Sequence, residues 1–564
     1  PADKGRADAL KAAMLEGWNP YPPEAAERYL REGHWRRETI AQAIGAAARR
    51  HAAERPDAIA IADARQRLGF DAMLREAARL AALLESRGIE RGDRIIVQLP
   101  NRVEFVTLML ACAEIGAVPV MALPALRRAE LEHLVALANP VAIAVAPRFR
   151  GFDHAALARE LRTRSPGLRT IFTTEPAEET ISLDSPIDPR GEIGSRGGDP
   201  FDLAILLLSG GTTGLPKLIP RSHADYLCGA QASAPVCGFT ADSRVLIALP
   251  VEHHFALGAP GLVGALMAGA TTILSESAQA ADIVQIAAAE RATHLPCVPA
   301  LAISILMLPD NLRDALESLR VIMVGGQRLQ EPTARELRRV LPNLLVQQVL
   351  GMTEGVLCYT RLDEGDELSC TTQGRPASSG DEIRVVDFDG TDVALGVIGE
   401  LWCRGPYTVR GYYRAEAENR ICFTADGFYR TGDLVRQTAS GNLIVAGRIK
   451  DQINRGGEKI SAEEVESHII AHPAVIAAAV VAMPDARMGE KACAFVTLAP
   501  GAALSLEGLA GFLAQRGLAR FKLPERVEII DAMPLTNVGK IKKAELKRAI
   551  ESRIAAEQAA AAPR

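Results

Sequence analysis

The stretch LLLSGGTTGLPKLIP, residues 206–220, joins an apolar run to a turn rich in glycine and hydroxyl side chains. The apolar run 203–208 has the length and composition of a buried strand. Glycines directly behind such a strand leave backbone N–H groups exposed, and these groups can hold phosphate oxygens. Pro216 precedes Lys217, so the turn lacks the Gly-Lys-Ser/Thr order of a Walker loop. We therefore predict a phosphate-binding loop of a different type.

The sequence around this loop alternates between helix-like and strand-like segments, from about residue 39 to residue 298. Residues 70–88 form an amphipathic pattern, and residues 104–116 again have helical periodicity after a short apolar run. Two later apolar runs, 319–326 and 344–351, both end in glycine. This alternation predicts an α/β protein with parallel sheets, whose ligands bind beyond the carboxyl ends of the strands.

The pattern changes in the last third of the chain. From about residue 381 shorter strands with turn residues predict a β-rich subdomain. Beyond Arg448 the sequence predicts a compact α+β unit with a helix that starts near Ala462. We predict a large N-terminal domain of two α/β subdomains plus the β-rich subdomain, residues 1–449, and a small mobile α+β C-terminal domain, residues 450–564.

Length, composition and charge limit the possible functions. The chain has 564 residues, which is too many for one hydrophobic core and indicates several domains. Its formal net charge of -5 excludes the strongly basic face that nucleic-acid binding normally requires. The nine cysteines form no CxxC pair, and the start PADKGRADALK is charged rather than apolar. We therefore predict reduced thiols in a cytoplasmic protein without a secretory leader.

Residues 107–126 are apolar enough to raise the question of a membrane span. They include Glu114, Gly116, Pro119 and Pro124, all of which are unfavourable in a lipid-facing helix. A buried helix followed by a strand fits this composition better, so we predict no membrane span.

Five motifs follow one another along the chain: SGGTTGLPK (209–217), GMTEG (351–355), YRTGD (429–433), GRIKDQINRGGEKISAEEVE (447–466) and PLTNVGKIKK (534–543). In this order they resemble the adenylate-forming superfamily of acyl-CoA synthetases, peptide-synthetase adenylation domains and luciferases. The stretches PKLIPRSHADY, QQVLGMTEGVLCYTRLDEGDE and TTQGRP are more specifically similar to the stand-alone aryl-acid AMP ligases of siderophore biosynthesis.

The resemblance implies an enzyme that joins a carboxylate to the α-phosphorus of ATP and expels pyrophosphate. Such chemistry needs a cradle for the phosphates, and the turn after Ser209 offers hydroxyls, N–H groups and one cation. The ATP-binding residues implied by the resemblance are Ser209, Gly210, Gly211, Thr212, Thr213, Gly214, Lys217, Gly351, Met352, Thr353, Asp433, Arg448 and Lys540.

Three residues are expected at the reacting groups. Lys540 resembles the catalytic lysine that bridges the acid and the α-phosphate, and Glu354 resembles the Mg²⁺ ligand. His253 is the third expected catalytic residue. No general base is required, because a carboxylate is already ionised at pH 7. By residue type alone, Lys540 could equally be a basic tail residue, Glu354 a solvated loop charge and Asp433 a turn-initiating aspartate.

The second half-reaction implies a rotation of the C-terminal domain, which removes the catalytic lysine and lets a thiol reach the acyl-adenylate. Lys450 resembles the hinge residue of that motion. Gly456 and Gly457 lack Cβ atoms and are expected to border the path of the phosphopantetheine thiol. A plain β-turn between two strands is the alternative explanation of the same glycines.

The acid is expected to lie against the segment LPVEHHFALGAPGLVGAL, residues 249–266, and the two Gly-ended strands. His254 stands where the aryl-acid ligases usually have an asparagine that contacts the ortho hydroxyl; imidazole can bind a hydroxyl, an amino group or a ring nitrogen. Ala259 stands where dihydroxybenzoate ligases tend to have serine, so a 3-hydroxyl would lose a hydrogen bond worth about 1 kcal/mol. The expected substrate-binding residues are His253, His254, Phe255, Ala259, Gly325, Gly326, Val349 and Gly351.

Salicylate is therefore the favoured substrate, and 2,3-dihydroxybenzoate or another ortho-substituted (hetero)aryl acid is the alternative. A metal site is the rival interpretation of the two adjacent histidines, although the sequence shows no third ligand for it. The sequence ends too soon after Lys540 to hold a carrier domain, so the expected partner is a separate aryl carrier protein with a phosphopantetheine arm. An aryl-CoA ligase and a non-catalytic nucleotide sensor remain the alternatives.

Overall fold

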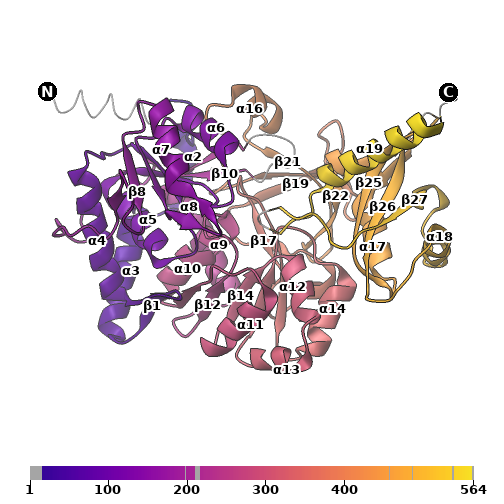
Figure 1. Cartoon of the computed structure of the whole chain (residues 1–564), viewed down its shortest axis with the longest axis horizontal. Coiled ribbons are helices and arrows are strands. Elements are labelled where there is room, and N and C mark those ends of the chain that lie inside the picture. The colour runs from indigo at the N-terminus through magenta and orange to yellow at the C-terminus, as the bar shows by residue number, and fades with distance from the viewer. Residues whose placement is uncertain are drawn as a thin grey trace.

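The computed structural model describes residues 16–196, 198–209, 216–456, 458–485, 487–536 and 539–561. Within these ranges the chain forms a large N-terminal body and a smaller C-terminal part. Figure 1 shows the smaller part at one end of the molecule, where α17 (Ala462–Ile470), α18 (Leu506–Gln515) and α19 (Lys543–Ala561) lie beside their own sheet.

The first sheet of the large body carries the segment that precedes the glycine-rich loop. Its strands are parallel except β11, which runs antiparallel to β10. Leu206 of β10 pairs with Val120 of β4, so the loop after β10 emerges at the carboxyl edge of a parallel sheet. The strand order is β11 (Leu218–Ser222), β10 (Leu203–Leu208), β4 (Val118–Met121), β3 (Arg94–Gln98), β5 (Ala142–Val145), β8 (Thr170–Thr173) and β9 (Ile181–Ser182).

The second sheet contains both Gly-ended strands of the sequence. Its central strands, β16, β15, β14, β12, β13 and β1, are parallel. At one edge β2 is antiparallel to β1, and at the other edge β17 is antiparallel to β16 and β18 is antiparallel to β17. The strand order is β18 (Arg375–Pro376), β17 (Leu357–Tyr359), β16 (Leu345–Gly351), β15 (Val321–Val324), β14 (His294–Cys297), β12 (Arg244–Ile247), β13 (Thr271–Leu274), β1 (Ile59–Ala62) and β2 (Arg67–Gly69).

Helices cover both faces of both sheets, which gives five layers in the order αβαβα. The central layer shares one continuous apolar core with the two sheets; it consists of α3 (Ile40–Glu54), α4 (Phe70–Ser86), α5 (Val103–Ile115), α8 (His223–Val236) and α10 (Gly261–Ala268). The outer helices are α6 (Arg128–Ala138) and α7 (His154–Arg164) on the first sheet, and α11 (Ala280–Ala289), α12 (Pro299–Leu306) and α14 (Glu331–Val340) on the second. The predicted α/β architecture with two subdomains is confirmed.

A four-stranded antiparallel sheet completes the N-terminal body, as the turn pattern after residue 381 predicts. Its order is β19 (Glu382–Val386), β20 (Gly399–Arg404), β21 (Tyr429–Gln437) and β22 (Leu443–Arg448). The register of the last pair places Asp433 directly opposite Arg448.

The C-terminal part is a mixed sheet with helices on both faces, so the predicted α+β unit is confirmed. The order is β24 (Glu458–Ser461), β23 (Gln452–Arg455), β26 (Gly489–Leu498) and β25 (Val475–Asp485), with β27 (Arg526–Ile529) paired in parallel to β26. One apolar core joins α17 and α18 to this sheet, and a second joins α19. The Ser461 side chain caps α17 by accepting a hydrogen bond from the Glu464 N–H, 3.2 Å away.

The apolar stretch 107–126 is a buried helix and a buried strand, as predicted. Helix α5 ends at Gly116, whose φ of 73° is the left-handed conformation that glycine adopts without strain. None of the helices in the described ranges is long and apolar enough to cross a membrane. The nine cysteines are free thiols, and burial raises the pKa of Cys112 to about 12.

Glu252 is a buried carboxylate in the turn before α9 (His254–Gly258), and it predicts a pH dependence of stability. Its side chain is buried, and neither carboxyl oxygen has a hydrogen-bond partner among the described residues. Burial raises the pKa of Glu252 well above 4.5. Folded protein therefore holds this proton more tightly than unfolded protein does. The stability that this proton binding contributes is complete below pH 4.5 and is lost as the pH rises.

We expect the free energy of unfolding of wild type, minus that of Glu252→Gln, to decrease with pH above about 4.5. The slope should approach about 1.4 kcal/mol per pH unit, the value for one proton. Denaturant unfolding at pH 4 to 8 measures this difference. Parallel pH profiles of the two proteins would contradict the expectation.

Candidate active site

A pocket of about 1100 Å³ lies where the carboxyl ends of the two parallel sheets meet the four-stranded sheet and the C-terminal part. It gathers residues that are hundreds of positions apart in the sequence. The predicted site residues among its lining are Ser209, Lys217, His253, His254, Phe255, Ala259, Gly326, Val349, Gly351, Met352, Thr353, Glu354, Asp433, Arg448, Lys450 and Lys540. Predicted residues Gly210, Gly211, Thr212, Thr213, Gly214 and Gly457 lie outside the described residues.

The two ends of the glycine-rich loop are fastened to each other. The Ser209 N–H donates to the Lys217 carbonyl oxygen at 2.9 Å, and the Lys217 N–H donates to Ser209 Oγ at 3.0 Å. The Lys217 ammonium lies 4.6 Å from the centre of the Tyr412 ring, a cation–π distance. The antiparallel pair β10–β11 thus holds one hydroxyl and one cation at the pocket wall.

Glu354 is oriented by tyrosines that the sequence analysis did not single out. The Tyr412 hydroxyl donates to Glu354 Oε1 at 2.9 Å and lies 3.1 Å from the Tyr429 hydroxyl. The described residues contain no group of three or more His, Cys, Asp and Glu side chains that could hold a metal ion. A metal at Glu354 would therefore take its other ligands from phosphate and water oxygens. This suits Mg²⁺, which commonly uses one or two carboxylates with substrate phosphates.

A fully buried ion pair supports the turn that carries Glu354. Arg221 lies in β11, the return strand of the loop, and its Nε donates to Asp225 Oδ1 at 2.5 Å. Its Nη1 donates to the carbonyl oxygen of Thr353 at 3.0 Å. The segments PRSHADY and GMTEG are both motifs of the sequence, but periodicity does not predict a contact between residues 132 positions apart.

Asp433 and Arg448 form an ion pair across β21 and β22, with Arg448 Nε 2.7 Å from Asp433 Oδ1. Asp433 is buried, whereas the Arg448 side chain is 45% exposed, and both residues line the pocket. The negative charge of Asp433 raises the pKa of Arg448. Arg448 therefore keeps its charge and holds one carboxylate oxygen in place.

Lys540 enters this pocket from the C-terminal part. Its N–H donates to Thr536 Oγ1 at 3.0 Å, and its carbonyl oxygen accepts from the Thr536 N–H at 2.6 Å, which closes the loop. A Cβ atom on Gly326 would lie only 3.2 Å from Lys540 Cε, so glycine leaves the side chain its space. Burial, together with Arg448, lowers the pKa of Lys540 to about 8, although Asp433 and Glu354 oppose this shift.

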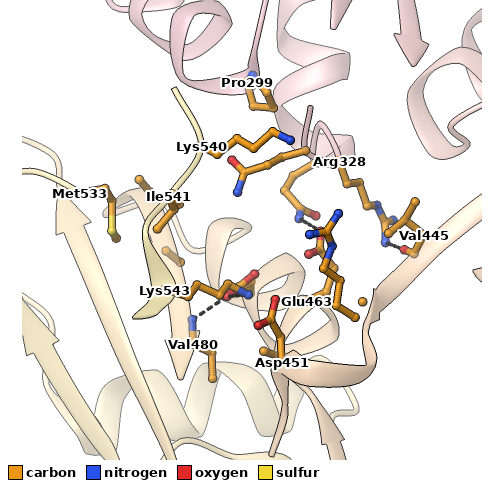
Figure 2. Close-up of a pocket in the computed structure, with 18 of the residues that line it drawn as sticks. Pro299, Arg328, Val445, Asp451, Glu463, Val480, Met533, Lys540, Ile541 and Lys543 are labelled. Atoms are coloured by element: carbon orange, nitrogen blue, oxygen red, sulfur yellow. Dashed lines mark hydrogen bonds and ion pairs between the residues drawn. The ribbon is translucent and has the colours of Figure 1, made fainter. Parts of the chain in front are cut away.

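A buried ion pair anchors the segment that follows Lys540. Lys543 Nζ lies 2.7 Å from Glu466 Oε1, and the Val480 N–H donates to the same oxygen at 2.6 Å. Figure 2 shows this cluster in a cleft of about 670 Å³ between the large body and the C-terminal part, with Lys540 beside Pro299. Burial raises the pKa of Glu466 to about 7, although Lys543 opposes it. The first turn of α19 is thereby fixed to α17 and β25.

An apolar wall with two histidines lines another part of the pocket. His253 precedes α9, and its Nδ1 accepts a hydrogen bond from the Phe255 N–H at 3.3 Å. Burial, assisted by Lys540, lowers the pKa of His253 to about 3, so the imidazole is neutral at pH 7. Gly325 lies directly behind the wall: a Cβ there would lie 3.2 Å from both Phe255 and Val349. Neither histidine joins a possible metal-binding group of the described residues.

Of the hinge and thiol-path residues, Lys450 lines the pocket and Gly456 does not. Lys450 lies in a short 3-10 turn, Ile449–Asp451, between β22 and β23. Gly456 lies in the turn of the β23–β24 hairpin, where a Cβ would be 2.6 Å from Met488 Cε. It lines neither the 1100 Å³ pocket nor the 670 Å³ cleft. β23 and β24 pair antiparallel on either side of this turn, and a role of Gly456 beside a thiol stays a prediction.

The model of the AMP-binding enzyme family matches residues 48–413, and that of the AMP-binding enzyme C-terminal domain matches residues 464–540. The chain belongs to the AMP-binding enzyme family. The family relation confirms the resemblance to adenylate-forming enzymes, which use ATP.

Relatives of this AMP-binding enzyme are similar over nearly the whole chain. The 2,3-dihydroxybenzoate-AMP ligase of Bacillus subtilis is 43% identical, with 96% of this chain and 99% of the relative covered. The salicyl-AMP ligase / salicyl-S-ArCP synthetase of Mycobacterium tuberculosis is 42% identical, with 95% and 94% covered. The apo structure of Mycobacterium smegmatis MbtA is 43% identical and superposes with a TM-score of 0.72, covering 95% of this chain and 99% of that one.

We expect Glu466→Ala to destabilise the C-terminal part, because it leaves the Lys543 ammonium buried without its carboxylate. Breaking a buried pair in this way costs about 3–5 kcal/mol. Hydrogen exchange followed by mass spectrometry should show faster exchange across α17 and the start of α19. The double variant Glu466→Leu/Lys543→Met should be less affected, and Glu336→Ala, which removes an exposed pair with Arg339, should change nothing. Equal effects of the single and double variants would contradict the expectation.

Proposed function

We propose that this AMP-binding enzyme activates an aryl carboxylic acid with ATP and transfers the acyl group to the phosphopantetheine thiol of an aryl carrier protein. The observation that carries the proposal is the meeting of Lys540, Glu354 and Asp433 at one pocket that also has an apolar wall formed by Phe255 and Val349. The names of the two relatives, one a dihydroxybenzoate-AMP ligase and one a salicyl-S-ArCP synthetase, support the same reaction.

ATP is proposed to lie across the pocket from the glycine-rich loop to the four-stranded sheet. Residues Ser209 to Lys217 would hold the β- and γ-phosphates, and Gly351, Met352 and Thr353 would line the nucleotide. Asp433, fixed by Arg448, would accept hydrogen bonds from the ribose hydroxyls. Each of these groups is a donor or acceptor of the type that its part of the nucleotide requires.

In the proposed first step a carboxylate oxygen attacks the α-phosphorus and the bond to the pyrophosphate oxygen breaks. Negative charge builds on the transferring oxygens, and the Lys540 ammonium stabilises it. The nucleophile is already ionised, so the neutral His253 is proposed to line the acid without removing a proton. Mg²⁺ held by Glu354 would supply further positive charge to the phosphates when bound.

The second step requires Lys540 to leave, and we propose residues 1–449 and 450–564 as the two moving domains with Lys450 as the hinge. Contacts that would have to break include the hydrogen bond from Ser461 Oγ to the Ala446 carbonyl oxygen. Another is the 3.2 Å hydrogen bond from Gln330 Nε2 to Glu463. After the rotation Gly456 and Gly457 would face the thiol. These few polar contacts make the interface reversible.

Salicylate is the proposed acid, because Ala259 offers no hydroxyl to a 3-OH group. 2,3-Dihydroxybenzoate is the alternative within the same reaction. An aryl-CoA ligase would use the same pocket and differ only in the thiol, so the acceptor is decided by comparing free CoA with a carrier protein. A cytoplasmic location stays a prediction of the sequence.

The decisive experiment is ATP–pyrophosphate exchange with salicylate, 2,3-dihydroxybenzoate and an aliphatic acid. We expect exchange with the aryl acids, and a loss of about 100-fold or more in Lys540→Ala, the size typical of removing one preorganised charge-stabilising group. Lys542→Ala, which removes the lysine two positions further along, should retain the activity. Transfer from preformed salicyl-AMP to the thiol should survive in Lys540→Ala. No exchange with any aryl acid would overturn the substrate class, and ATP binding without exchange would favour a nucleotide sensor.

The lowered pKa of Lys540 gives the adenylation step a pH dependence. The pKa of about 8 means that the ammonium predominates below pH 8 and is lost above it. We therefore expect kcat/KM for ATP, which reports the free enzyme, to fall about tenfold per pH unit above this value. The residual activity of Lys540→Ala should lack this alkaline limb. An identical limb in the variant would assign it to another group.

A further inference from the structure

Tyr226 and His254 form a buried pair at the apolar wall of the pocket. Tyr226 is fully buried, and its ring centre lies 5.5 Å from that of His254. The Tyr226 hydroxyl lies 3.5 Å from His254 Nδ1. A Cβ on Gly258 would lie 2.6 Å from the same hydroxyl, so the phenol is wedged between the histidine and the backbone of α9. The pair has little freedom to rearrange.

The two nitrogens of His254 differ in their hydrogen-bond partners. Nδ1 of His254 has Tyr226 as its neighbour, whereas Nε2 is buried and has no partner within the described ranges. If Nδ1 carried the proton, it would donate to the tyrosine oxygen, and the buried tyrosine O–H would need another acceptor. If the tyrosine donates to Nδ1 instead, its proton is used and only Nε2–H is left unpaired. A buried donor without a partner is costly, so the second arrangement is favoured.

The imidazole is also neutral. Burial, Arg221 and His253 all act to lower the pKa of His254 well below its usual value of 6.5. The guanidinium of Arg221 lies 5.3 Å from the centre of the Tyr226 ring. A neutral imidazole has one donor and one acceptor nitrogen, and the tyrosine takes the acceptor. The nitrogen left for a ligand is a donor.

We propose that Tyr226 fixes His254 as a hydrogen-bond donor to the substrate, and that the pocket thereby selects aryl acids with a hydrogen-bond acceptor at the ortho position. This rests on the proposed function, since it assumes an aryl acid against the wall formed by His254, Phe255 and Val349. The acceptor is a ring nitrogen or a phenol oxygen. Tyr226 is then a specificity-determining residue that acts through His254.

Ortho substituents differ in what they offer to such a donor. The hydroxyl of salicylate donates its proton to its own carboxylate and keeps oxygen lone pairs free, and the ring nitrogen of picolinate is an acceptor only. The amino group of anthranilate presents N–H donors, because its lone pair is delocalised into the ring. Benzoate offers no polar group at that position. Placing two donors face to face leaves both unpaired, so anthranilate should be the poorest of the four.

The test measures kcat/KM in ATP–pyrophosphate exchange for salicylate, picolinate, benzoate and anthranilate. In wild type we expect salicylate and picolinate to exceed anthranilate by about 10- to 100-fold, the range that one unpaired buried group produces. In Tyr226→Phe the imidazole is free to move its proton to Nδ1, so the ratio of salicylate to anthranilate should fall at least fivefold. Tyr29→Phe, another buried tyrosine with a hydrogen-bonded hydroxyl, is the matched control and should keep the wild-type ratio.

His254→Asn gives a second readout in case Tyr226→Phe folds poorly. An asparagine amide can present either its oxygen or its NH₂ group, so this variant should accept anthranilate better than wild type does while retaining salicylate. Selective ¹⁵N labelling of histidine should show a proton on Nε2 in wild type and a mixture of tautomers in Tyr226→Phe. Unchanged substrate ratios in both variants, with exchange intact, would overturn the role of Tyr226. Absence of exchange with every aryl acid would instead overturn the proposed function.

Discussion

The site depends on one cation that reaches the pocket from the far end of the chain. Lys540 lies among Arg448 and Lys450, close enough for like charge and burial to lower its pKa to about 8. Glu354 and Asp433 offset only part of this repulsion. An adenylate-forming enzyme binds ATP, and the phosphates of ATP supply the negative charge that the empty arrangement of side chains lacks. In the proposed reaction the nucleotide is thus both the substrate and a counterion for Lys540.

The lysine reaches this position through two structural constraints. Gly326 lacks the Cβ atom that would crowd Lys540 Cε, and its φ of 83° is a conformation that other residues adopt only with strain. The Lys543–Glu466 ion pair fixes the residues just after Lys540 to the core of the C-terminal part. Gly326 leaves space in the large body for the Lys540 side chain, and the Lys543–Glu466 pair orients the loop that carries Lys540. Movement of the C-terminal part therefore moves the ammonium as part of a rigid unit.

The buried polar groups around the pocket include an ion pair that supports the site and a histidine that faces the proposed acid. Arg221 joins Asp225 to the carbonyl oxygen of Thr353, which holds the turn that carries Glu354. His254 lines the pocket, and its Nε2 has no partner among the described residues. Buried polar atoms in proteins are nearly always paired, so this nitrogen supports the proposed contact with the acid. Arg221 of β11 supports the site, and Tyr226, five positions later in α8, contacts His254.

The sequence by itself determined the α/β architecture and the β-rich and α+β parts, because periodicity is a local property of the chain. The resemblance of its motifs to a known family implied Lys540, Glu354 and Asp433, which the structure places at one pocket. Tyr412 and the pair of Arg221 with Thr353 were not found, since their contacts join segments with no shared periodicity. Only the tertiary structure decided how Tyr226 meets His254, which ring nitrogen is left for the substrate and that Gly326 admits Lys540. These depend on distances between side chains, which folding fixes when the carboxyl ends of separate sheets converge.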